Sequence, residues 1–429
     1  MTKVDVFNGD QIGGCVTVIK TEVDGKVHRI MIDYGESLPG SDNSEPFNYP
    51  WDTEPVDAVF FTHNHMDHIG RLLEIPEEVP IYMGSIARQV MINMQSYLAR
   101  GRGEEVAKHR RELEILKDES RTHTFTSEDK ISITGFTITP HIVCHSAFDS
   151  YMFLVETGDK VILHTGDYRG HGRFGDRMIP AIKEIRAEKE INYLITEGTM
   201  MTRSSEHVMT EDEMMMEAAE YMKNHKYVFL VCASTNLDSI ASFYQAAQIA
   251  SEPYGRYLYV YNNYYLTQLR YFADVAGKIN EVYDMKNIFK LEPYKELKSK
   301  SWKKPMLQKD LCEITGFLAM IKPEEWCEQY IMPFIEDYRD GKITEMPVII
   351  YSMWDGYLRD DPANTAKIES WVNFTQKMEK KGVEIKHLHT SGHATPQMIT
   401  EVINAACPTD EIIPLHQEVE KLQALLIKM

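Results

Sequence analysis

The sequence lacks several features that would assign it to a special class of protein. None of its six cysteines forms a CxxC pair, which argues against a disulfide framework and against a structural zinc site built from thiolates. No apolar run approaches the ~20 residues that a membrane-spanning helix needs. The first residues, MTKVDVFNGDQIGG, show no charged region followed by an apolar stretch and a cleavage site, so we expect a cytoplasmic protein without a membrane partner.

Positive charge is also scarce, since 46 Lys and Arg stand against 65 Asp and Glu, for a formal net charge of −19 at pH 7. This balance argues against indiscriminate binding of nucleic acid by the whole surface, but it is compatible with a local basic groove. Residues 285–309 reverse the balance locally, with eight lysines against two glutamates. With Tyr294 and Trp302 this segment would contact phosphates and stack a base, although a solvated surface helix has the same composition.

The composition is that of an ordinary globular protein, with 43% apolar and 26% charged residues. A length of 429 residues is sufficient for two or three lobes. Up to about residue 200, short strands alternate with turns, and residues 85–119 read as helix with a break at Gly101 and Gly103. From about 210 to 365, longer helical patterns alternate with strands, which predicts a parallel sheet covered by helices. The remaining residues return to strand, turn, helix and strand, so the middle region is predicted to be an insertion or cap.

The densest concentration of metal-binding side chains is FFTHNHMDHIG, directly after an apolar strand. In an extended loop, alternate residues point the same way, so His63 and His65 can chelate one ion together. Asp67 and His68 belong to the following turn and can face a second ion. Imidazole and carboxylate ligands suit zinc, and manganese as the share of oxygen ligands increases. Two ions need further ligands, for which His145 and Asp167 are candidates, although each could equally be a cap or turn residue.

Asp33 is a carboxylate at the end of an earlier strand, and we expect it to orient the His-rich loop. The chain resembles the metallo-β-lactamase superfamily in an ordered series of residues, namely Asp33, His63, His65, Asp67, His68, His145 and Asp167. Further along, LITEGTMMTR, LVCASTNLDS, HTSGHAT and IIPLHQE are similar to its β-CASP branch, which includes ribonuclease J and the cleavage-and-polyadenylation endonuclease. The resemblance covers nearly the whole chain. It implies an α/β fold, an αββα sandwich made of residues 1–208 and 366–429, with an inserted β-CASP α/β cap at 209–365 and the active site between them.

The resemblance also implies the ligands of two divalent metal ions, which we expect to be zinc or manganese. His63, His65 and His145 would hold the first ion, and Asp167 would bridge the two. Asp67, His68 and His416 would hold the second, and Asp67 counts among the catalytic residues. A hydroxide bridging the metals would be the nucleophile. A histidine at the position of His416 goes, in that branch, with RNA substrates.

His393 in SGHA matches the motif histidine that serves as general acid, and Glu197 in TEGT matches the acidic residue that would orient it. A histidine can give the departing oxygen a proton at neutral pH. A metal-ligand or buried structural role for His393 is the alternative. Substrate contacts are expected from four residues that could equally be caps or turn residues: Ser391, Thr395, Ser146 and Asn236.

The predicted function is therefore a metal-dependent ribonuclease acting on single-stranded RNA. A hydrolase of small esters, thioesters or lactones, and a catalytically silent RNA-binding subunit, are the alternatives. The C-terminal domain that ribonuclease J uses for dimerisation is not expected after His416, so the oligomeric state, including a homo-oligomer, is open. Endonucleolytic and 5′-exonucleolytic cleavage are also both open.

Overall fold

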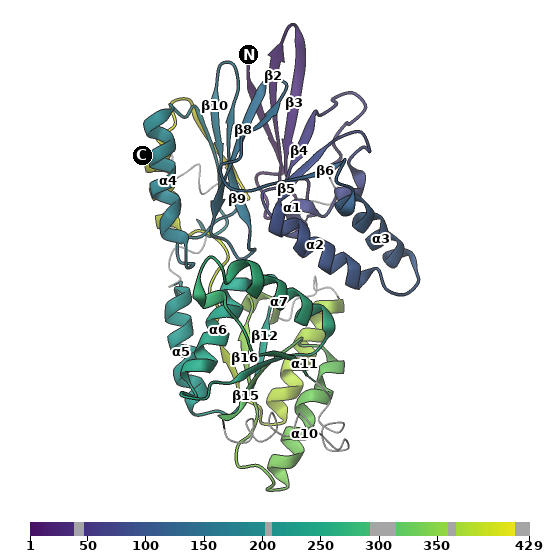
Figure 1. Ribbon diagram of the computed structural model, residues 1–429, viewed down its shortest axis with the longest axis vertical. Coiled ribbons are helices and arrows are strands. Elements are labelled where there is room, and N and C mark those ends of the chain that lie inside the picture. Colours follow the sequence, from purple (N-terminus) through teal and green to yellow (C-terminus); the bar gives the residue numbers. More distant parts are fainter. Residues whose placement is uncertain (38–46, 202–207, 292–314, 359–365, 417–429) are drawn as a thin grey trace. The chain divides into compact units, whose positions relative to one another are not determined.

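The computed structural model describes five stretches of the chain, residues 1–37, 47–201, 208–291, 315–358 and 366–416 (Figure 1). They form two compact units, one made of Met1–Val208 and the chain from Gly392 onward, the other of Met209–Ser391. Most of the lysine-rich segment, from residue 292 onward, lies outside the described residues, so its role stays a prediction.

The first sheet of the first unit contains the N-terminal half of the sandwich. A tight hairpin joins β2 to β3 at Asp24 and Gly25, whose φ angles of 50° and 75° are those that such a turn needs. The sheet has the order β1-β2-β3-β4-β5-β6, with β1 at Lys3–Phe7, β2 at Val16–Val23, β3 at Lys26–Ile32, β4 at Ala58–Phe60, β5 at Ile81–Gly84 and β6 at Thr122–Phe125.

The second sheet joins the middle of this unit to the C-terminal segment. β18 pairs in parallel with β11, which places Glu197 beside Leu415. The pairing joins distant parts of the chain, since Thr199 and His416, which form a contact just beyond these strands, are 217 positions apart. The predicted return of the chain to this sheet is thereby confirmed. The order is β18-β11-β10-β9-β8-β7, with β7 at Ile131–Ile133, β8 at Phe136–Val143, β9 at Ser150–Glu156, β10 at Val161–His164, β11 at Tyr193–Glu197 and β18 at Glu411–Leu415.

Helices cover the outer face of each sheet, which gives the predicted αββα layers (Figure 1). Strand alternation produces these layers, as β9 shows. Tyr151, Phe153 and Val155 belong to the core between the sheets, whereas Met152 and Leu154 belong to the core under α4 and α12. The helices are α1 at Met66–Ile69, α2 at Ser85–Leu98, α3 at Glu104–Lys117, α4 at Met178–Glu188 and α12 at Pro396–Ala406, with short 3₁₀ turns at Leu72–Glu74 and Gly175–Arg177.

The second unit is a parallel sheet with helices, as its alternating texture predicted. Its order is β14-β13-β15-β12-β16-β17, and all five pairings are parallel. Its strands are β12 at Tyr227–Cys232, β13 at Tyr257–Val260, β14 at Ile288–Lys290, β15 at Phe317–Ile321, β16 at Val348–Ser352 and β17 at Ile385–His387. Its helices are α5 at Glu211–Lys223, α6 at Leu237–Ile249, α7 at Asn263–Ala276, α10 at Glu328–Arg339 and α11 at Ala366–Lys380, and its 3₁₀ turns are Glu281–Tyr283, Glu325–Cys327 and Asp355–Leu358.

The sequence assigned residues 366–391 to the sandwich, but they lie in the second unit. The physical reason is strand pairing, since Ile385–His387 extends the parallel sheet along the edge of β16 and its neighbour Leu388 donates to the Tyr351 carbonyl. The assignment of this unit as a β-CASP cap stays a prediction. Within the parts of the chain that the structure describes, no helix is both long and apolar enough to cross a membrane.

Candidate metal centre

The predicted metal ligands of the first unit converge on one edge of its two sheets. They follow the carboxyl ends of four strands, since the residues directly after these strands form the rim of the same edge. β4 leads to His63, His65, Asp67 and His68, β8 to His145, β10 to Asp167, and β18 to His416. Glu197, which is not a predicted ligand, ends a fifth strand, β11. All but two of these ligands, His65 and Asp67, are buried.

The His-rich loop is held in place by Asp33, as the sequence predicted for this carboxylate. The Asp33 carboxylate accepts hydrogen bonds from the Thr62 backbone N–H and hydroxyl, each at 2.8 Å, and lies 2.8 Å from Nδ1 of His68. Gly35 allows the loop to approach closely, because a Cβ there would lie 1.8 Å from the Asp67 carbonyl oxygen. The loop therefore has little freedom to move its ligand atoms.

The first candidate group is His63, His65 and His145, whose ligand nitrogens lie within 4.8 Å of one another. Nδ1 of His65 lies 3.1 Å from Nε2 of His63 and 3.2 Å from Nε2 of His145. Burial lowers the pKa of His63 and of His145 well below the usual range, and that of His65 to about 4. The three imidazoles are therefore neutral at pH 7, as a metal ligand must be.

The second candidate group is Asp67, His68 and His416. Nε2 of His416 lies 3.3 Å from Oδ2 of Asp67, and Nε2 of His68 lies 3.9 Å from the same oxygen. Burial alone would raise the pKa of Asp67, but the neighbouring His68 and His416 outweigh it and hold that pKa well below its usual range. Asp67 is therefore an anionic ligand at neutral pH.

Asp167 lies between the two groups. Its Oδ2 is 3.2 Å from Nε2 of His68 and 3.8 Å from Nε2 of His416, and it also forms a candidate group with His63 and His68. Its Oδ1 is buried and, among the described residues, has no hydrogen-bond partner. A buried carboxylate oxygen without a partner is costly unless a cation balances it. Together with the convergent lone pairs of neutral imidazoles, this atom fits a pair of divalent cations.

Three of the candidate ligands, His63, His68 and His145, place Nδ1, the nitrogen that faces away from the centre, against an oxygen atom. Nδ1 of His63 lies 3.0 Å from the Thr62 hydroxyl, and Nδ1 of His145 donates to the Gly392 carbonyl at 2.6 Å. Nδ1 of His68 lies against Asp33, and burial, which opposes its charge, is outweighed by Asp167 and Asp33, so the pKa of His68 is raised well above its usual value. The contacts of His63 and His145 leave Nε2 of each ring for a metal, whereas an ion at Nε2 of His68 would displace the proton that its raised pKa retains.

His393 lies beside these groups and is paired with Glu197. Nδ1 of His393 is 3.0 Å from Oε2 of Glu197 and 3.6 Å from Oδ2 of Asp167. The other Glu197 oxygen accepts from the backbone N–H of Tyr168 at 2.8 Å. Burial opposes charge on His393, but the Glu197 and Asp167 carboxylates outweigh it and raise the pKa of His393 to about 9. His393 also forms a candidate ligand group with Asp167 and His416, so the alternative ligand role is geometrically compatible.

Two of the four predicted substrate contacts have structural roles of their own. Thr395 caps α12 by accepting from the Met398 N–H at 3.3 Å, and Asn236 caps α6 by accepting from the Ser239 N–H at 3.4 Å. The Ser146 hydroxyl lies 3.4 Å from Nε2 of His145. Ser391 is the last residue of the second unit and is partly exposed. The substrate roles of all four stay predictions.

Sequence reasoning missed the threonines that contact the ligand histidines. Thr62 precedes His63, and Thr199 lies 2.8 Å from Nδ1 of His416. A polar residue two positions beyond the end of a buried strand was the available signal for both. It carries little weight alone, because threonine is common at such positions as a turn or cap residue.

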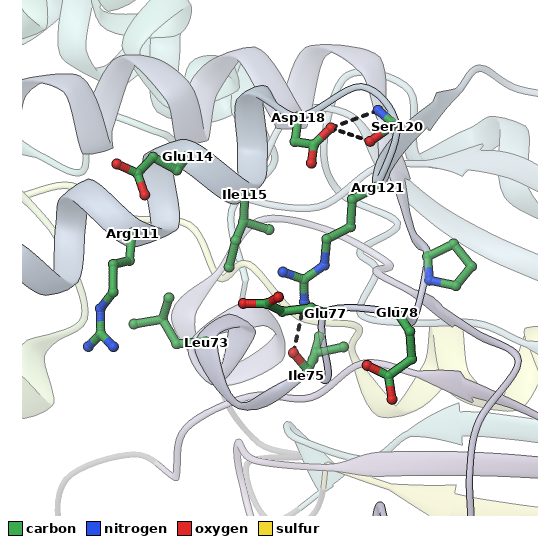
Figure 2. A pocket seen from close by; sticks show the side chains of 11 residues that line it. Leu73, Ile75, Glu77, Glu78, Arg111, Glu114, Ile115, Asp118, Ser120 and Arg121 are labelled. Atoms are coloured by element: carbon green, nitrogen blue, oxygen red, sulfur yellow. Dashed lines mark hydrogen bonds between the residues drawn. The ribbon is translucent and has the colours of Figure 1, made fainter.

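A hollow of about 560 Å³ lies elsewhere in the first unit, beside the end of α3 (Figure 2). It is rich in charge, and Arg121 donates across it to the Ile75 carbonyl at 2.7 Å. None of the candidate metal ligands lines it. The lining residues are Leu73, Ile75, Glu77, Glu78, Pro80, Arg111, Glu114, Ile115, Asp118, Ser120 and Arg121.

Comparison with known proteins identifies a domain, a protein and a structure that are similar to this chain. Residues 28–230 match the model of a beta-lactamase superfamily domain. Over 150 residues the chain is 27% identical to ribonuclease J of Mycoplasma genitalium, a match that covers 34% of this chain and 23% of that protein. The crystal structure of a protein of unknown function from Enterococcus faecalis V583 superposes with a TM-score of 0.66 at 17% identity, covering 98% of this chain and 96% of that one, and so shares the fold. Residues 28–230 of the chain are therefore similar to a beta-lactamase superfamily domain.

Proposed function

We propose that this protein is a metal-dependent ribonuclease of the β-CASP branch, which hydrolyses phosphodiester bonds of single-stranded RNA. The superfamily domain supports hydrolysis, and the similarity to a ribonuclease J supports RNA as the substrate. The observation that carries the proposal is the His393–Glu197 pair, set at 3.0 Å beside the candidate metal groups. A phosphodiester needs a proton for its departing oxygen, which a histidine so placed supplies.

The roles of the residues follow from their positions. His63, His65 and His145 would hold one divalent ion, Asp67, His68 and His416 the other, and Asp167 would contact both. Two such cations, zinc or manganese, supply an activated water and offset negative charge on the phosphate when bound.

The proton at the leaving oxygen is assigned to His393. Glu197 accepts a hydrogen bond from the Nδ1–H of His393, which fixes the orientation of the ring. The proton that is transferred to the leaving oxygen is then the one on Nε2. Glu197 is itself fixed by the Tyr168 N–H at 2.8 Å, so the pair is held before substrate arrives. Glu197 is therefore a positioning residue, and His393 the proton donor.

The direct test is cleavage of single-stranded RNA by the purified protein with Zn²⁺ or Mn²⁺. We expect cleavage by the wild type, loss of cleavage in His65→Ala, and a fall of about 100-fold or more in His393→Ala, the usual size of a general-acid effect. His28→Ala is the matched control, because His28 lies near the amino end of β3, at the opposite end of that strand from the centre. An inactive wild type, or equal rates in all variants, would contradict the proposal.

The same assay separates the other functions. Generic esters, thioesters and lactones are tested beside RNA, and faster turnover of these than of RNA would favour a small-substrate hydrolase. Elemental analysis close to zero metal ions per chain would favour a silent RNA-binding subunit. RNA labelled at its 5′ end distinguishes the two cleavage modes, since stepwise release of mononucleotides marks an exonuclease and internal fragments mark an endonuclease.

A further inference from the structure

Thr199 lies two residues beyond the end of β11, the strand that pairs with β18 and so places His416 at the centre. β11 ends at Glu197 and β18 at Leu415, and the parallel register places these two residues side by side. The Gly198 N–H extends the pairing by donating to the Leu415 carbonyl at 3.0 Å. Gly198 is therefore the residue opposite His416, and Thr199 follows Gly198 directly. Both Thr199 and His416 are buried, at 4% and 0% exposure.

The Thr199 hydroxyl makes two contacts, both with the same residue. Its Oγ1 is 3.1 Å from the carbonyl oxygen of His416 and 2.8 Å from Nδ1 of its ring. A hydroxyl has a single hydrogen to donate, and a carbonyl oxygen can only accept. Both contacts are hydrogen bonds only if the hydroxyl donates to the carbonyl and accepts from an Nδ1–H. The reverse assignment would leave two acceptor oxygens facing each other without a hydrogen between them.

We propose that Thr199 is a positioning residue that keeps the proton of His416 on Nδ1 and so presents Nε2 as the ligand atom of the second metal group. Nε2 is the nitrogen that lies 3.3 Å from Asp67 and 3.8 Å from Asp167. The inference deepens the proposed function, since it rests on the metal centre on which that function depends. It does not rest on RNA being the substrate.

The backbone of His416 supports the same role. Its φ of 52° lies in the left-handed region, which a histidine occupies at a cost. The hydrogen bond from Thr199 to the His416 carbonyl holds the peptide in this conformation while the second contact holds the ring. One hydroxyl thus fixes two aspects of a ligand that no regular element supports, because His416 lies just beyond the end of β18.

The consequence is specific to the second metal group. Contacts that hold the outer nitrogen of a ligand histidine are typically worth 10- to 100-fold in metal affinity. We expect Thr199→Val, which keeps the shape of the side chain without the hydroxyl, to weaken binding of one ion by about this factor. The ion held by His63, His65 and His145 is expected to bind as in the wild type. Among the described residues, the Thr199 hydroxyl contacts His416 and none of these three histidines.

The experiment is a titration of the metal-free full chain with Co²⁺ in competition with a chelator, followed by the visible absorption of the bound ion. Thr199→Ser should restore the wild-type affinity and spectrum, since it restores the hydroxyl. Thr196→Val is the matched control, because the Thr196 hydroxyl is buried in the same segment but lies 3.2 Å from the Tyr168 hydroxyl. Circular dichroism verifies folding, and Thr199→Ala replaces the valine variant if that one does not fold.

The outcomes separate this inference from the ribonuclease proposal. Two ions in the wild type, with one weakened in Thr199→Val and restored in Thr199→Ser, support the role of Thr199 whether or not RNA is cleaved. Equal affinities in wild type and Thr199→Val, weakening that serine does not restore, or a wild type that binds no Co²⁺ would each overturn it. Failure to cleave RNA with normal metal binding would contradict the ribonuclease proposal alone.

Discussion

At the scale of the residue, the centre uses histidine in two orientations. His63, His68, His145 and His416 each place Nδ1 against an oxygen atom and direct Nε2 inward. His65 is reversed, since its Nδ1 lies within 3.2 Å of Nε2 of its neighbours. The H-x-H spacing explains the difference, because two side chains that leave the same loop in the same direction must reach a common point by different atoms.

His164, a buried histidine outside the candidate ligand groups, predicts how stability depends on pH. It lies between the sheets with Nε2 3.2 Å from the Thr17 hydroxyl, and burial lowers its pKa from 6.5 to about 4. As the pH falls below 6.5, His164 becomes protonated in the unfolded chain, whereas in the folded chain it stays neutral until about pH 4. The free energy of unfolding should therefore fall by up to about 3 kcal/mol over this window, at ~1.4 kcal/mol for each unit of pKa.

Urea unfolding of the chelator-treated protein between pH 7 and pH 4 measures this loss. His164→Gln keeps a side chain of similar size without a titrating group, so its stability should fall less over the same window. The other buried histidines contribute equally to both proteins, and only the difference between the two slopes belongs to His164. Parallel slopes would contradict the prediction.

The candidate ligands could be selected from the sequence, but most of the residues that form hydrogen bonds with them could not. His63, His65, Asp67 and His68 stand in one short loop, and their residue types alone indicate a metal. Thr199 gives no such signal, because its partner His416 is remote in sequence and meets it only through the parallel register of two strands. Hydrogen bonds set by tertiary register leave no periodic pattern in the chain.

At the scale of the element, the loops of the centre also support neighbouring helices. Helix α2 begins after Gly84, which has no side chain to cap it. Asp149, just before β9, supplies the cap from another part of the chain, since its Oδ2 accepts from the N–H groups of Ile86 and Ala87, each at 2.8 Å. Gly84 is needed for this approach, because a Cβ there would lie 2.3 Å from the same oxygen.

Removing this cap should destabilise the first unit. Asp149→Ala leaves two N–H groups of α2 without their acceptor, at an expected cost of roughly 1–3 kcal/mol in the free energy of unfolding. Asp149→Asn should cost much less, because its amide oxygen can accept both bonds and its NH₂ can donate to the Tyr151 hydroxyl. Asn also tolerates the φ of 68° found here. Chemical denaturation measures all three proteins, and equal losses for alanine and asparagine would contradict the cap.

At the scale of the whole molecule, the periodicity of apolar residues predicted two units that each combine sheets and helices. It did not predict where the second unit ends. The first boundary follows a change of texture near residue 208, where strand-rich sequence gives way to longer helices. No such change marks residue 392, because α11, β17, α12 and β18 alternate helix and strand without interruption. Only strand pairing shows that β17 joins β16 whereas β18 joins β11.

Because every candidate ligand lies in the first unit, metal removal should affect the two units unequally. An ion that binds only the folded state stabilises it by RT ln(1 + [L]/Kd), about 2.7 kcal/mol at 100 times Kd. Chelation should therefore speed amide hydrogen exchange in peptides of the first unit that hold ligands, such as residues 60–70 and 411–416, and leave β12 of the second unit unchanged. Exchange followed by mass spectrometry, with and without chelator, measures both. Faster exchange in both units, or in neither, would contradict a metal centre confined to the first.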